Sequence, residues 1–203
     1  MYIRNEGFFQ YIKNYPIVST IILLHVLLFI MNFIPLIPHK YIFQWLSGVN
    51  LYIADGQFWR LITPIFVHAS FPHLLFNSFS LLIFGPFLER LVGKLIFCIF
   101  YLICGVIGNI ATYLLLPLTY SHVGASGAIF GLFGMYLAMI VLKKHMLTMT
   151  IHQVIIPIVV IALVMTFLEP NVNIISHIFG ILSGYLMGIV YLTAKKRASN
   201  KFF

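Results

Sequence analysis

Charged side chains are scarce in this 203-residue chain, and acidic ones are almost absent. Charged residues make up 8% of the sequence, and only four of them are Asp or Glu. A typical soluble domain carries roughly 25% charged residues, so this chain could not cover a water-exposed surface. Hydrophobic residues account for 62% of the sequence. These proportions exclude an ordinary soluble domain and indicate a protein whose solvent is the lipid bilayer.

Other absences narrow the function. The two cysteines, Cys98 and Cys104, lie in one apolar run and are read as buried thiols, not as a disulfide framework. The chain has no His-Glu-x-x-His motif and no acid in the middle of an apolar run. A zinc peptidase and a paired-aspartate protease are therefore excluded. No phosphate loop, dinucleotide motif or soluble nucleic-acid module is present, so we expect no metal, no cofactor and no nucleic-acid partner.

The uncharged runs of the sequence predict six membrane-spanning helices, each of about 20 residues. We expect these spans near Pro16–Ile34, from Phe71–His73 onward, in the two halves of 95–142, near 149–168 and near 174–194. The segment Pro117–Gly124 supplies the turn between the third and fourth spans. The predicted fold class is thus an all-α membrane bundle.

The segment 35–70, between the first two spans, alternates aromatic and polar side chains. Such a segment suits the headgroup level, so we expect an outer interfacial loop there. The predicted organisation is a short cytoplasmic N-terminus (1–15), a six-span domain (16–194) and a basic cytoplasmic tail (195–203).

Basic residues indicate the orientation of these spans. Two of them, Lys40 and Arg60, fall on one side of the predicted membrane. Ten fall on the other: Arg4, Lys13, Arg90, Lys94, Lys143, Lys144, Lys195, Lys196, Arg197 and Lys201. This asymmetry predicts a multi-pass protein with both termini in the cytoplasm. The Lys-, Ile- and Asn-rich composition favours a bacterial cell membrane.

This topology places several polar residues at one depth. Spans two, four and six all run inward from the outer face, so their first turns lie at the same level. The polar residues in these turns are His73, Asn77, Ser126, Ser176 and His177. Three helices that present polar groups at one level could form a single hydrated site.

Each of these motifs has a structural reading as well as a functional one. His73 and Asn77 are four residues apart and share a helix face, where they could simply form interhelical hydrogen bonds. Ser126, at the start of span four, could simply cap that helix. As a nucleophile it would instead gain free N–H groups able to stabilise an oxyanion.

Small residues favour close packing of spans four and six. They are Gly127, Gly131 and Gly134 on span four, and Gly180, Gly184 and Gly188 after His177 on span six. Glycines at these spacings let two helix backbones approach closely. Close packing would bring Ser126 and His177 within hydrogen-bond reach, which is the activation geometry for a serine nucleophile. Of the other histidines, we expect His25 to be hydrogen-bonded within the bundle and His68 to brace the outer loop.

In order and spacing, these residues resemble the rhomboid intramembrane serine proteases in their basic six-span form, over roughly residues 40–194. The matching elements are Trp59 and Arg60, the pair His73 and Asn77, Glu89 and Gly93, Gly124 to Gly127, and His177 with Gly180 and Gly184. The resemblance implies a rhomboid-like bundle and a serine endopeptidase that cleaves transmembrane protein substrates from a site open to the outer face.

The resemblance also implies roles for individual residues. Ser126 would be the nucleophile and His177 the general base. The backbone N–H of Ser126 and the side chains of His73 and Asn77 would hold the oxyanion. Gly124 would line the approach to Ser126, and Phe76 would lie at the substrate entry between spans two and five. No metal or cofactor is implied.

Further positions are read from the same resemblance. Trp59, Arg60 and Glu89 look like scaffold residues. Many relatives carry Tyr four residues after the nucleophile, and this chain has Phe130 at that position. A phenylalanine ring can still pack against the histidine, but it cannot form the hydrogen bond of a tyrosine hydroxyl.

Two alternative functions stay open. One is a catalytically silent relative that binds membrane clients, although both Ser and His remain here. The other is a small transporter, which typically has its polar site at the midplane.

Overall fold

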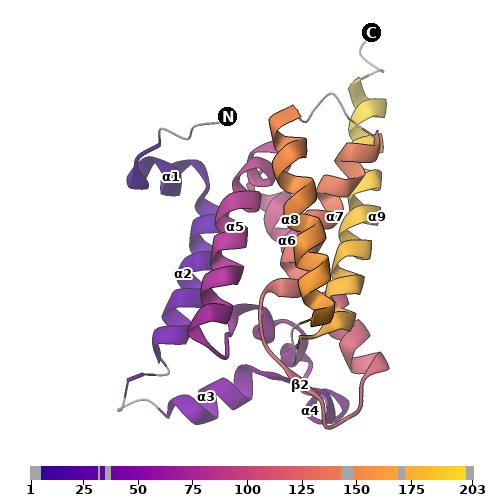
Figure 1. Cartoon of the computed structure of the whole chain (residues 1–203). Helices are drawn as coiled ribbons and strands as arrows, with labels where there is room; N and C mark the ends of the chain where they lie inside the picture. The colour runs from indigo at the N-terminus through magenta and orange to yellow at the C-terminus, as the bar shows by residue number, and fades with distance from the viewer. Residues whose placement is uncertain (1–5, 32, 35–37, 143–148, 169–171, 200–203) are drawn as a thin grey trace.

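The computed structural model describes residues 6–31, 33–34, 38–142, 149–168 and 172–199. Long helices stand side by side to form a bundle, and a group of short elements closes one end of it (Figure 1). In chain order the elements are α1 (Phe8–Asn14), α2 (Pro16–Met31), α3 (His39–Leu46), β1 (Gly48–Val49), α4 (Asn50–Ala54), the 3-10 turns η1 (Phe58–Leu61) and η2 (Thr63–Phe66), α5 (Phe71–Val92), α6 (Lys94–Leu115), β2 (Ser121–His122), α7 (Ser126–Leu142), α8 (Met149–Leu168) and α9 (Ile174–Ser199).

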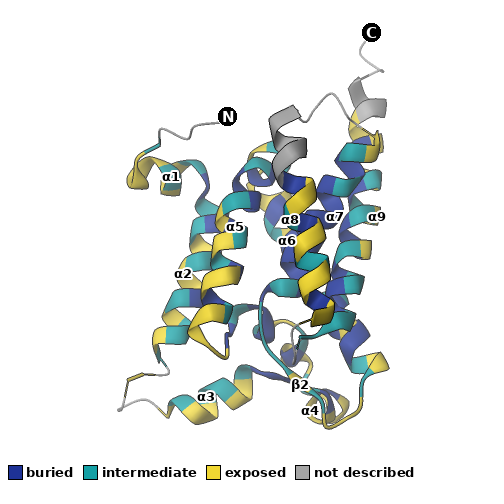
Figure 2. Ribbon diagram, in the orientation of Figure 1, coloured by how far each residue is buried: buried dark blue, intermediate teal, exposed yellow. Residues whose placement is uncertain are grey.

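The predicted spans correspond to six apolar helices. Three of them, α5, α6 and α9, are long and apolar enough to cross a membrane by themselves, and α1 with α2 passes the same test as a pair bent by 111°. The helix α7 and the described part of α8 are apolar but shorter. The predicted turn Pro117–Gly124 separates α6 from α7, as expected. The all-helical bundle is therefore confirmed, and exposed apolar side chains line the outward faces of α2, α5 and α8 (Figure 2).

The helix α1 and the C-terminal end of α9 lie at one end of the bundle, and α3 and α4 lie at the other (Figure 1). An even number of crossings produces this arrangement, because each crossing reverses the direction of the chain. Which end faces the cytoplasm stays a prediction from the basic residues.

Glu89, near the C-terminal end of α5, fixes the start of α2. Its carboxylate is only 2% exposed and accepts hydrogen bonds from the backbone N–H groups of Ile17 and Val18, at 3.0 and 2.9 Å. The first N–H groups of a helix lack acceptors within it, and the helix dipole makes that end positive. A buried carboxylate therefore satisfies both the donors and the charge, in line with the scaffold role expected for Glu89.

The α7–α9 seam is formed by glycines on both helices, as the sequence predicted. A Cβ atom on Gly180 would strike the carbonyl oxygen of Gly127, and one on Gly184 would strike that of Gly131. The match shifts further along the seam, where Gly134 faces the backbone of Ile181 and Gly188 packs against Ala138 and Met135. The two backbones are therefore in direct contact from Gly127 to Gly134.

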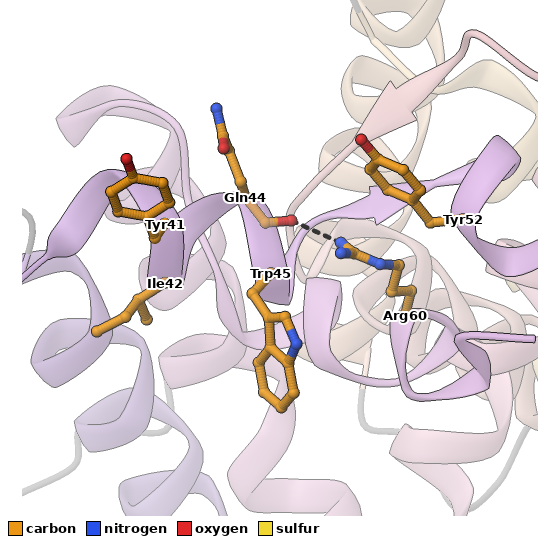
Figure 3. Close-up of a pocket in the computed structure, with 6 residues that line it drawn as sticks. All are labelled: Tyr41, Ile42, Gln44, Trp45, Tyr52 and Arg60. Carbon is orange, nitrogen blue, oxygen red and sulfur yellow. Dashed lines mark hydrogen bonds between the residues drawn. The ribbon is translucent and has the colours of Figure 1, made fainter. Parts of the chain in front are cut away.

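The segment between α2 and α5 is held together by polar side chains. The guanidinium of Arg60 donates to the carbonyl oxygens of Gln44 and Ser47, at 2.5 and 2.6 Å, and its Nε donates to Gln57 at 2.7 Å. Figure 3 shows Arg60 reaching toward Gln44 at a pocket lined by Tyr41, Ile42, Gln44, Trp45, Tyr52 and Arg60. The indole of Trp59 donates to the carbonyl of Trp45 at 3.3 Å, so both predicted scaffold residues stabilise this loop.

Two short strands, which the sequence pattern did not predict, form beside this loop. Gly48 pairs with His122 and Val49 with Ser121 in an antiparallel ladder. The N–H of Asn50 extends this contact by donating to the carbonyl of Tyr120 at 3.1 Å. The turn between α6 and α7 passes beside the loop, so their backbone groups satisfy one another. Pairing of this kind depends on tertiary proximity and leaves no pattern in four residues.

Candidate active site

Ser126 is the first residue of α7 and follows a loop shaped by Gly124. The φ angle of Gly124 is 124°, which side chains rarely allow, and its N–H donates to the carbonyl of Pro64 at 2.8 Å. The N–H groups in the first turn of a helix have no acceptor within that helix. Ser126 therefore combines a hydroxyl with a backbone N–H that its own helix leaves free.

His73, in the first turn of α5, lies against this loop. A Cβ atom on Gly124 would be 2.5 Å from Nε2 and 2.6 Å from Cε1 of His73. The imidazole therefore occupies the space that a side chain at position 124 would need. Both the φ angle and this contact require glycine, and they place His73 beside the backbone two residues before Ser126.

Asn77 lies one turn further along α5 and is 6% exposed. Its Nδ2 donates to the carbonyl oxygen of His73 at 2.9 Å. One amide hydrogen of Asn77 is thus bonded to its own helix, and the second remains for another acceptor. Phe76, the preceding residue, is 70% exposed on the outside of α5. The structure places both residues near the first turn of α5, while their roles in catalysis stay predictions.

His177 lies in the first turn of α9 and is 7% exposed. Its imidazole stacks on the ring of Phe130, with centroids 4.0 Å apart and planes 13° from parallel. Phe130 is four residues, or one helical turn, after Ser126 on α7. The expected ring packing at this position is therefore confirmed, and it places the His177 ring one turn from Ser126.

The second polar contact of His177 comes from α8. Oγ1 of Thr166 lies 2.8 Å from Nδ1 of His177, and the same hydroxyl donates to the carbonyl of Ala162 at 2.8 Å. Sequence reasoning missed Thr166, although a signal existed. Residues 155–165 are all apolar, and the last turn of α8 lies at the same end of the bundle as the first turns of α7 and α9 (Figure 1).

The α7–α9 seam brings Ser126 and His177 to the same level. Gly127, next to Ser126, faces the hydroxyl of Ser176, next to His177. In the described parts of the chain, no hydrogen bond joins the two side chains themselves. Hydrogen bonds between a nucleophile and its base are often long in free enzymes and shorten when substrate binds. The seam therefore holds Ser126 and His177 at one level, with no bond between their side chains in the free protein.

The expectation for His25 was wrong. Both ring nitrogens of this fully buried residue lack a hydrogen-bond partner, and the ring packs 4.6 Å from that of His68. The loop before α5 folds back against α2 and places the ring of His68 beside His25.

His68 is also buried, and its ring lies 5.1 Å from that of His73. Burial and the neighbouring imidazoles lower the pKa of His68 far below its ordinary value, so its ring is neutral.

A metal centre has no support in the described residues. Among them, no three side chains of His, Cys, Asp or Glu come together in a way that could hold a metal ion. The chemistry available is that of a hydroxyl, imidazoles, an amide and backbone N–H groups. Such a set can perform nucleophilic attack on a carbonyl group.

The helices and their apolar surfaces define a multi-pass membrane protein, and comparison with known sequences identifies the family. Residues 55–194 match the Rhomboid domain. The chain is 44% identical over 199 residues to the Bacillus subtilis protein named "Putative rhomboid protease YdcA", covering 97% of this chain and 99% of that protein.

Two further relatives match a smaller share of their own length. The rhomboid protease GluP of Bacillus subtilis is 39% identical over 67% of this chain and 26% of its own. Rhomboid-like protease 1 of Toxoplasma gondii is 32% identical over 78% of this chain and 56% of its own. The chain belongs to the rhomboid family. Rhomboid proteases are serine endopeptidases of the membrane, so the predicted family and enzyme class are confirmed.

Proposed function

We propose that this chain cleaves transmembrane segments of other membrane proteins, with Ser126 as nucleophile and His177 as general base. The observation that carries the proposal is the stacking of His177 on Phe130, one turn from Ser126, across a seam where the two backbones touch. Such a seam leaves the two side chains little freedom to separate. A nucleophile and a base held in this way are the minimum for acyl transfer.

The reaction proceeds in two halves. Nε2 of His177 takes the proton from Oγ of Ser126 as Oγ bonds to the substrate carbonyl carbon. The imidazolium then gives that proton to the leaving amine as the peptide bond breaks, which leaves an acyl-enzyme. In the second half, water bonds to the ester carbonyl carbon while Nε2 of His177 takes its proton. The ester bond to Oγ then breaks, the imidazolium returns the proton to Oγ of Ser126, and the new carboxyl terminus of the substrate leaves.

Charge on the tetrahedral intermediate needs donors, because lipid supplies none. The backbone N–H of Ser126, the imidazole of His73 and the free amide hydrogen of Asn77 are the proposed donors. Removing one such donor from a soluble protease costs about 2.7–4 kcal/mol of transition-state stabilisation. Gly124 is proposed to line the approach to Ser126, and a side chain there would displace the His73 ring from its place beside this loop.

A substrate helix must unwind before Ser126 can reach a carbonyl carbon, because its carbonyl groups are bonded within the helix. Gly and Pro in the substrate lower that cost. We propose that such segments enter beside the exposed ring of Phe76, between α5 and α8. The hydrated site opens to the outer face, where the first turns of α5, α7 and α9 lie.

We further propose that both termini face the cytoplasm of a bacterial cell. Ten basic residues on the inner segments, against two on the outer ones, support this orientation. A reporter fused after Lys201 should be read in the cytoplasm, and one inserted at Thr119 should be read outside. An external C-terminus would contradict the proposed topology.

The test of the dyad is cleavage of a transmembrane substrate by purified protein in liposomes. Ser126→Ala and His177→Ala should each reduce cleavage to background and leave the melting temperature nearly unchanged. Ser176→Ala is the matched control: it removes a hydroxyl at the same depth, but one that points at Gly108 and Gly127, so cleavage should persist. Cleavage by Ser126→Ala protein free of host proteases would reject the assignment.

A further inference from the structure

We infer that Thr166 of α8 is a positioning residue that selects the reactive tautomer of His177. The inference rests on the proposed dyad and adds a third helix to it. Thr166 is 2% exposed, and its Oγ1 lies 2.8 Å from Nδ1 of His177. Both partners are buried, so water does not compete for this hydrogen bond.

The direction of the bond follows from counting hydrogen atoms. A threonine hydroxyl has one hydrogen and two lone pairs. The Thr166 hydroxyl donates its hydrogen to the carbonyl oxygen of Ala162, four residues earlier in α8, at 2.8 Å. We assign that hydrogen to Ala162, so the Thr166 oxygen accepts from Nδ1 of His177. The neutral imidazole must then carry its hydrogen on Nδ1, and Nε2 keeps the lone pair that a general base needs.

Two contacts together fix the ring. Stacking on Phe130 sets the plane of the imidazole, and the bond to Thr166 sets its rotation within that plane. A half-turn of the ring about its Cβ–Cγ bond would keep the same plane but exchange Nδ1 for Cδ2. The ring would then present a C–H group to Thr166 and lose the hydrogen bond. The acceptor here is a neutral hydroxyl, so it orients the base without adding the negative charge that an aspartate supplies in a triad.

The test compares two substitutions at the same position. Thr166→Val has nearly the same shape but no hydroxyl, and it leaves Nδ1 buried without an acceptor. Thr166→Ser keeps the hydroxyl. Thr112→Val is the matched control, because the buried Thr112 hydroxyl also donates four residues back, to Gly108 at 2.8 Å, but pairs with Asn173 instead of His177.

Nitrogen-15 NMR of histidine-labelled protein, with the His177 signals assigned by their loss in His177→Asn, reports the tautomer directly. We expect wild-type His177 to be protonated on Nδ1, and Thr166→Val to lose this preference. In Thr166→Val, kcat should fall roughly 10- to 100-fold with KM nearly unchanged, as expected for a lost buried hydrogen bond to the base. Thr166→Ser should stay within about threefold of wild type, and Thr112→Val should lower the melting temperature while leaving kcat of the folded protein intact.

Two results would overturn the inference. One is wild-type His177 protonated on Nε2, which needs no variant to fold. The other is Thr166→Val with an unchanged tautomer and unchanged kcat. The NMR measurement can also be made on Ser126→Ala protein. If Ser126→Ala still cleaves substrate, the proposed dyad fails, whereas the tautomer result tests the role of Thr166 separately.

Discussion

The helices that carry Ser126 and His177 pack backbone to backbone, whereas the helix that carries His73 and Asn77 packs through side chains. At the α7–α9 seam, a Cβ atom on Gly184 would meet the carbonyl group and Cα of Gly131. On α5, a Cβ atom on Gly85 would meet side-chain methyl groups of Val18 and Leu81. The proposed reacting groups are thus fixed by main-chain contacts, and the proposed oxyanion donors by softer ones.

The largest effect should come from adding one methyl group to the seam. Gly184→Ala puts Cβ against backbone atoms of Gly131, which can yield only if α7 and α9 separate. We expect a loss of about 3 kcal/mol in stability, at the upper end of ordinary overpacking, and loss of most cleavage activity. Thermal unfolding and cleavage assays in one detergent measure both.

Gly85→Ala is the matched control for that substitution. It is also a buried helical glycine, but Val18 and Leu81 can shift, and alanine has the better helix propensity by about 1 kcal/mol. Its melting temperature should therefore change little. Equal losses in Gly184→Ala and Gly85→Ala would show that the two regions do not differ in stiffness.

A smaller and different effect is expected on the α5 side of the site. Asn77→Ala removes one proposed oxyanion donor and leaves the backbone N–H of Ser126 in place. We expect kcat to fall roughly 10- to 1000-fold without abolishing cleavage. Stability should change by only about 1–2 kcal/mol, since hydrogen bonds between or within helices in membranes are modest. Full turnover by a destabilised Asn77→Ala protein would assign this residue a structural role alone.

The smallest catalytic effect should come from the opposite end of the bundle. Glu89→Gln keeps the size of the side chain but removes the charge that faces the start of α2. We expect a loss of about 1–2 kcal/mol in stability, with kcat of the folded fraction unchanged. Asp55→Asn, which neutralises an exposed acid, is the control and should leave the melting temperature unaltered. A lower kcat in Glu89→Gln would mean that the α2–α5 contact reaches the site.

Much of the bundle could be predicted because its physical causes are local in sequence. The charge-free runs located the spans, and the glycine spacing predicted the α7–α9 seam. Local sequence patterns could not predict three other features: the contact of Thr166 with His177, the contact of His25 with His68, and the pairing of the two short strands. They depend on which segments meet in space: α8 with α9, the loop before α5 with α2, and the α6–α7 turn with Gly48. Asn77 shows a further limit of prediction from sequence. The residue type shows that its amide has two hydrogens to donate, but not that one of them bonds to the carbonyl of His73 in the same helix.

Labelling with a fluorophosphonate probe tests the dyad most directly, because only an activated serine reacts with it. The wild-type protein in membranes should be labelled at Ser126, as mapped by mass spectrometry of its peptides. Ser126→Ala should not be labelled, and His177→Ala should lose labelling although Ser126 is still present. Labelling at another serine, or labelling of Ser126 that persists in folded His177→Ala, would contradict the proposed mechanism.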